Sequence, residues 1–138
     1  MGNKLGYGAC RLLDELEVEF YDFRSKTLPS VDDVRKAPVL FTVWTSNLPL
    51  KTGAWTKIGH ISITDYAPQI FCKQDPVTGA LSLTQDGRET PATLADCEGR
   101  ETAAIWNSAQ IEGRLNDHFA GRPNPRVEAL KPAPRGTP

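Results

Sequence analysis

The chain has 138 residues, of which 39% are hydrophobic and 24% charged, and its formal net charge is −1. A chain of this length and composition is typical of one globular domain with a buried core, and it argues against wholesale disorder. No run of about 18 apolar residues is present and no apolar segment follows Met1, so neither a membrane span nor a secretory signal is predicted. The nearly neutral total disfavours a general nucleic-acid-binding protein, which would usually be basic.

Charge is distributed unevenly along the chain. Residues 14–33 hold seven acidic and two basic side chains, whereas residues 122–138 hold four basic side chains and one acidic one. The simplest interpretation is a solvated acidic face and a basic tail. The three cysteines, Cys10, Cys72 and Cys97, form no C-x-x-C pair. We expect reduced, buried thiols in a cytoplasmic protein rather than a disulfide or zinc framework.

Two strands are expected near the start of the chain, at residues 6–13 and 16–23, joined by a turn at Asp14 and Glu15. In the second segment Leu16, Val18 and Phe20 alternate with polar residues. A period of two predicts one face on the core and one face in water. The face in water would carry Glu15, Glu17, Glu19 and Tyr21.

The middle of the chain contains further strand and helix signals. Ser30 is expected to cap a helix that ends before Pro38. The apolar, β-branched run at 38–44 is typical of a central strand, and residues 46–53 form a loop or short helix. We predict more strands at 55–59, 68–74 and 81–84, with a turn at 85–88.

The C-terminal part is predicted to contain a helix from Thr93 to residue 99, a strand at 102–106 and a longer helix capped by Ser108. An edge strand is expected at 126–130. The resulting fold class is α+β, a mostly antiparallel and strongly twisted sheet with two or three short helices packed on it. Residues 1–130 would form the single domain, and 131–138 a flexible Pro/Gly-rich tail.

Catalytic or metal-binding motifs are not found in the sequence. P-loop, GxSxG, HExxH and EF-hand patterns are absent, and the only histidines are His60 and His118. His118 suits the C-terminus of a helix, where the helix dipole favours it. Cys97 lies between two acidic residues, which disfavours a reactive thiolate. We therefore predict no catalytic residue, no metal and no cofactor, and a protein that is not an enzyme.

The three tryptophans are candidates for the core or for recognition. Trp44 and Trp106 fall in predicted strands and are expected to pack inside. Trp55 follows Gly53 in a loop-rich stretch, so it is the better candidate for a partly exposed recognition aromatic.

Three blocks of the sequence resemble the immunity protein 26 family. The first is the strand Pro38–Trp44 followed by G-x-W-x-x-I-G at Gly53–Gly59. The second runs from Ala95 to Trp106, an acidic turn before an apolar strand ending in Trp, and the third is the helix Ile111–Phe119 with Gly121–Asn124. The resemblance extends over roughly residues 6–130. Arg100 and Pro125–Arg126 depart from the family pattern.

The resemblance implies a bacterial immunity protein of a polymorphic toxin system. Such a protein binds a cognate toxin domain in the producer's cytoplasm and occludes its active site. It needs no cofactor, membrane or direct nucleic-acid contact. If the toxin is a nuclease, its basic groove would suit an acidic row. The expected partner-binding residues are Glu15, Glu17, Glu19, Tyr21, Trp55, Glu98 and Glu101.

Two other functions stay open at this point. A peptide- or nucleic-acid-binding module would need exposed aromatic side chains within a basic face. A small hydrolase would need a pocket with a perturbed Cys, His or Asp pair. The sequence favours the toxin-neutralising protein because its basic residues gather in the tail and it lacks such a pair.

Overall fold

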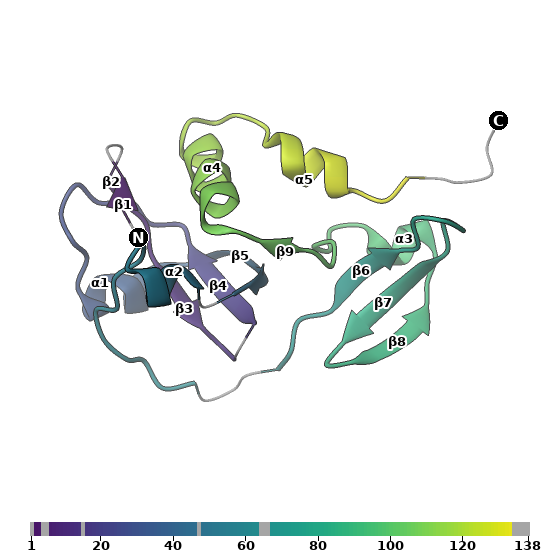
Figure 1. The fold of residues 1–138 in the computed structure, drawn as a ribbon, viewed down its shortest axis with the longest axis horizontal. Helices are drawn as coiled ribbons and strands as arrows, with labels where there is room; N and C mark the ends of the chain where they lie inside the picture. Colours follow the sequence, from purple (N-terminus) through teal and green to yellow (C-terminus); the bar gives the residue numbers. More distant parts are fainter. Residues whose placement is uncertain (1, 4–5, 15, 47, 64–66, 134–138) are drawn as a thin grey trace.

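The computed structural model describes residues 2–3, 6–14, 16–46, 48–63 and 67–133. Its strands form three sheets: a two-stranded ribbon, a four-stranded first sheet in the order β3-β4-β5-β9, and a three-stranded second sheet in the order β6-β7-β8 (Figure 1). The ribbon is β1 (Gly2–Asn3) and β2 (Gly6–Tyr7). The first sheet contains β3 (Cys10–Leu12), β4 (Glu17–Tyr21), β5 (Val39–Thr45) and β9 (Ile105–Trp106). The second sheet contains β6 (Phe71–Gln74), β7 (Leu81–Gln85) and β8 (Arg88–Pro91).

Five short helices accompany the sheets in the part of the chain that the structure describes. They are α1 (Val31–Lys36), α2 (Leu48–Thr52), α3 (Leu94–Cys97), α4 (Ser108–Phe119) and α5 (Pro125–Leu130). Antiparallel pairs dominate among the described strands, whereas β9 pairs in parallel with β5 and Cys72 of β6 forms a parallel bridge with Thr102. The predicted α+β class is confirmed.

Local capping explains where several helices begin. Ser30 accepts a hydrogen bond from the Asp33 amide at the start of α1, and the Asp33 carboxylate accepts from the Ser30 amide. The same reciprocal pair forms between Asn107 and Gln110 at α4, so this helix is capped one residue earlier than predicted. These pairs satisfy amides that have no partner within the helix.

Two secondary-structure predictions are wrong, and one strand adds to the predicted elements. Residues 126–130 form helix α5 rather than an edge strand, because Asn124 caps it and Pro125 fits its first position. Residues 55–59 form no strand. The turn predicted at 85–88 is present, and both Asp86 and Gly87 have positive φ, as a tight hairpin requires. The chain continues from this turn into the additional strand β8.

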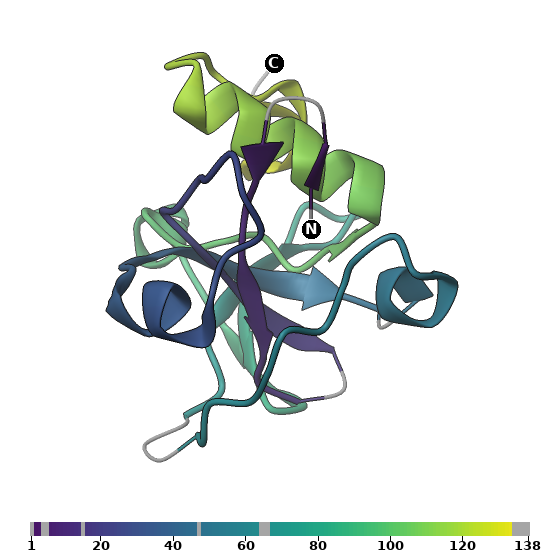
Figure 2. The same ribbon diagram turned by 90° about the vertical axis from the view of Figure 1, so that its left-hand side faces the viewer.

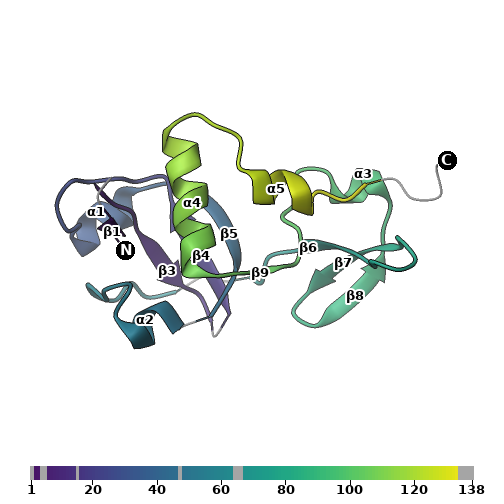
Figure 3. The ribbon, with the colours of Figure 1, turned by 45° about the horizontal axis from the view of Figure 1, so that its top comes forward.

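The core lies on both faces of the first sheet. On one face α4 crosses β4 and β5 (Figure 3), and Ile111 and Leu115 pack with Phe20, Val43 and Trp106. On the other face, Tyr21 packs with Ala9 and Val34 from α1. Figure 2 shows α1 and α2 on either side of β3, with the segment after α2 running past the sheet.

The end of the chain contacts the second sheet as far as the structure describes it. The Gln74 side chain donates to the Ala133 carbonyl at 2.8 Å and accepts from its amide at 3.2 Å. The rest of the predicted tail, 134–138, lies outside the described residues.

Among the described helices, none is long and apolar enough to cross a membrane.

Candidate partner-binding groove

A groove of about 300 Å³ runs along β3 at the edge of the first sheet. We call it the β3 groove. Its walls come from three parts of the chain: residues 8–12, residues 28–34 and residues 55–63, with Leu50 at one end. Most of its lining is apolar, and several of these side chains are exposed: Leu12, Leu28, Ile58 and Ile63. Exposed apolar surface gathered in one groove is typical of a binding site.

The residues that line the groove come from both faces of the first sheet. Leu50 and Trp55 belong to the core face that α4 covers, whereas Val34 and Ile61 belong to the opposite face. All four line the groove. The groove therefore wraps around the edge of β3 instead of lying on one face of the sheet.

The segment that bears G-x-W-x-x-I-G forms one wall of the β3 groove. Gly53 has a φ of +80°, a conformation that favours glycine. Trp55 is 4% exposed and makes an edge contact with Phe20, their ring centroids being 5.8 Å apart. Ile58 remains exposed, and a Cβ on Gly59 would overlap the Val31 side chain. The motif thus anchors the wall in the core and lets it approach α1 closely.

Charge in the groove has one sign. Arg11, Lys57 and His60 are lining residues, and no carboxylate belongs to the described lining. Arg11 forms an ion pair with Glu19 at 2.7 Å, whereas Lys57 and His60 are exposed. The groove therefore suits an apolar partner segment that is neutral or acidic.

The expected acidic row does not face water. Glu17 and Glu19 are 5% and 9% exposed, and Tyr21 is 5% exposed. Glu17 accepts a hydrogen bond from the Gln69 amide, and Glu19 accepts from the Tyr21 hydroxyl and pairs with Arg11. The prediction of a solvated face is wrong for these residues because β4 is an inner strand and the chain covers both its faces. Glu15 lies outside the described residues.

The Tyr21 hydroxyl and the Cys10 thiol both have raised pKa values. Burial, reinforced by the hydrogen bond to Glu19, raises the pKa of Tyr21 well above its usual range. Burial also raises the pKa of the Cys10 thiol from 9.0 to about 11. Both groups are therefore neutral at ordinary pH, and Cys10 is a poor nucleophile.

Trp55, Glu98 and Glu101 lie in different settings. Trp55 is a core residue, so the prediction of a partly exposed aromatic is wrong. Glu98 is exposed, and both it and Glu101 line a second hollow of about 740 Å³ between α3 and α5. Glu101 accepts two hydrogen bonds from Arg114, at 2.9 and 2.7 Å. Arg114 also stacks on Phe41, its guanidinium carbon 3.7 Å from the ring centroid, so this pair holds α4 in place.

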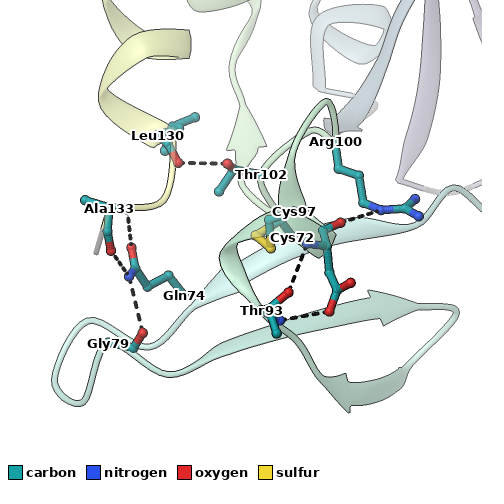
Figure 4. Close-up of a disulfide and its surroundings, with 10 residues drawn as sticks. Cys72, Gln74, Gly79, Thr93, Cys97, Arg100, Thr102, Leu130 and Ala133 are labelled. Atoms are coloured by element: carbon teal, nitrogen blue, oxygen red, sulfur yellow. Dashed lines mark hydrogen bonds between the residues drawn. A yellow bond between two sulfur atoms is a disulfide. The ribbon is translucent and has the colours of Figure 1, made fainter. Parts of the chain in front are cut away.

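A disulfide joins the second sheet to α3. Cys72 on β6 and Cys97 at the end of α3 are bonded and buried (Figure 4), and Cys10 is the free cysteine. The prediction of three reduced thiols is therefore wrong for this pair. Since disulfides persist in oxidising compartments, this bond gives no support to a cytoplasmic location. The spacing of the cysteines did not indicate this disulfide, because the fold brings Cys72 and Cys97 together from positions 25 residues apart.

His118, His60 and Cys97 lie in different settings. His118 lies 3.0 Å from Asp22, between the end of α4 and the chain after β4. His60 is on the wall of the β3 groove. Cys97 is bonded to Cys72. The described residues hold no cluster of three or more metal-ligating side chains.

The fold and groove define a small α+β protein with an exposed apolar groove at a sheet edge. The family model of immunity protein 26 matches residues 1–80, more than half of the chain, and the chain belongs to this family. The match includes every described residue that lines the β3 groove. The two C-terminal blocks of the resemblance lie beyond it. No curated protein and no solved structure shows significant similarity to the chain.

Proposed function

We propose that this protein neutralises a cognate bacterial toxin by binding it and occluding its active site, without catalysis. Family membership supports a toxin as the partner. The observation that carries the proposal is the β3 groove, an exposed apolar surface with basic groups at its rim. Steric occlusion requires a complementary surface and no reactive group.

The structure of the first sheet does not support the hypothesis that the toxin is a nuclease. That idea required an acidic row facing a basic toxin groove, and Glu17 and Glu19 are bonded inside the chain. Among the predicted acidic contacts that the structure describes, Glu98 is exposed and lies beside the second hollow, so it is a candidate for a partner contact. We assign the main contact to the β3 groove and leave the toxin's chemistry open to experiment.

Co-expression with the toxin domain encoded next to this gene tests the function. We expect wild-type protein to restore growth and to co-purify with the toxin. Leu28→Asp places a charge on an exposed lining residue and should weaken both effects at least tenfold. Val77→Asp is the matched control, since Val77 is 80% exposed on the distant second sheet's turn.

The outcomes separate binding from catalysis. Growth rescue with a stable complex supports the proposal. Rescue without binding would identify an enzyme acting on the toxin or its product. Equal effects of both substitutions would exclude the β3 groove as the contact surface.

A further inference from the structure

Among the described strands, none pairs with the backbone groups on one side of β3. The Tyr21 amide donates to the Ala9 carbonyl at 3.1 Å, and the Leu13 amide donates to the Glu17 carbonyl at 2.9 Å. In an antiparallel ladder alternate residues bond to the neighbouring strand, so Cys10 and Leu12 direct their N–H and C=O groups away from β4. Within the described ranges, no strand pairs with that side of β3.

The β3 groove lies along this same open edge. It is lined on the α4 face by Leu50 and Trp55, and on the α1 face by Val34 and Ile61. An added strand would point successive side chains to opposite faces of the sheet. Each face of the edge therefore offers an apolar contact to alternate side chains of such a strand.

The charged side chains that line the β3 groove restrict the composition of a strand that could be added there. Lys57 and His60 are exposed at the rim, and carboxylates are missing from the lining as far as it is described. An unpaired strand edge beside an apolar groove can bind an extended chain of many sequences. The basic groups at the rim favour a chain that carries an acidic residue.

We propose that β3 is the docking edge for an extended toxin segment with apolar and acidic side chains, which joins the first sheet as an additional strand. The inference rests on the proposed function and adds the mode of recognition to it. Main-chain hydrogen bonds to Cys10 and Leu12 provide affinity, and the groove provides specificity through alternate side chains.

Hydrogen exchange on wild-type protein and its complex tests the strand addition directly. The probe is the purified, inactivated toxin domain encoded next to this gene. We expect the Cys10 and Leu12 amides to exchange rapidly in the free protein and to slow at least tenfold in the complex. A stable complex in which both amides still exchange rapidly would overturn the strand addition and leave the proposed function standing. Failure to form any complex would overturn both.

A pair of substitutions at one residue separates backbone from side chain. Leu12→Ala removes the side chain and keeps the amide, whereas Leu12→Pro also removes the outward N–H, which an edge strand tolerates. We expect Leu12→Pro to bind the toxin domain at least tenfold more weakly than Leu12→Ala, with the fold checked by circular dichroism. Equal affinities would overturn the proposal, and the exchange experiment decides it if the proline variant does not fold.

A charge reversal tests the acidic residue in the toxin segment. Lys57→Glu should slow association with the toxin domain severalfold at low salt, and the difference should shrink as salt rises. Arg88→Glu, an exposed change on β8, is the matched control and should leave the rate unchanged. Faster association of Lys57→Glu would show that the segment is basic.

Discussion

Gly59 occupies a position where a side chain would collide with α1. A Cβ there would overlap the side chain of Val31, which is branched and has little freedom to turn away. We predict that Gly59→Ala destabilises the protein by about 1–3 kcal/mol, as overpacking usually does. Denaturant unfolding would measure the change. Val31→Ala should recover most of the loss in the double variant, and simple additivity of the two effects would contradict the predicted contact.

The raised pKa values of Tyr21 and Cys10 lead us to expect a loss of folding stability at alkaline pH. The pKa of each group is raised on folding, so each contributes stability that is complete below its unfolded pKa and is lost as pH rises through the folded one. We expect the free energy of unfolding to fall as pH rises from 9 to about 11, on the order of 2 kcal/mol coming from Cys10.

Variants at these two residues check the assignment. Cys10→Ala and Tyr21→Phe remove the ionisable groups, so each should flatten the dependence of stability on pH, and the double variant should flatten it further. The slope is the readout, because each substitution also changes packing. An unchanged slope in the double variant would show that other groups cause the alkaline loss.

At the scale of elements, the disulfide is expected to support the second sheet. Cys72 and Cys97 are 25 residues apart in sequence, and between them lie β7 and β8. Closing a loop of this length stabilises a protein by about 3 kcal/mol. The Cys72→Ser/Cys97→Ser variant should therefore have a clearly lower free energy of unfolding. Cys10→Ser is the control, because Cys10 is a free cysteine. An equal loss of unfolding free energy in this variant would contradict the stabilising role of the disulfide.

The sequence predicted elements well where the signal is local. Ser30 and Thr93 were expected to cap helices and do so, because capping depends on residues within one turn. The alternation in β4 was also correctly recognised, with Val18 and Phe20 in the core. Residues 126–130 were misjudged although Asn124 and Pro125 carried the helix signal.

The site was less predictable because it depends on contacts between distant segments. Alternation shows that Glu17 and Glu19 share a face, but Arg11 and Gln69 cover that face, and no local pattern indicates this. The β3 groove joins residues 8–12, 28–34 and 55–63, which come together only in the fold. The G-x-W-x-x-I-G motif forms one wall of the groove, but Trp55, the expected recognition aromatic, contributes to the core rather than to an exposed contact.

At the scale of the whole molecule, the two larger sheets differ in how much core they have. Both apolar clusters are centred on the first sheet, whereas Phe71, Cys72 and Thr84 are the buried residues of the second sheet's strands. We predict that reduction loosens the second sheet while the first remains folded. Hydrogen exchange of reduced and oxidised protein should show faster exchange in β6–β8 and little change in β4 and β5. Equal acceleration in both sheets would indicate one cooperative unit.

The disulfide also changes what a single cut in the chain would do. The turn at Asp86 and Gly87 is exposed and lies between the two bonded cysteines. A protease that cuts there leaves two fragments that are still covalently joined, one carrying the whole β3 groove and the other carrying α4. Since α4 supplies Ile111 and Leu115 to the core beneath that groove, the nicked protein keeps all the parts that its binding surface needs. Such a molecule would migrate as one band without reductant and as two with it, and only the reduced form would be free to lose the helix.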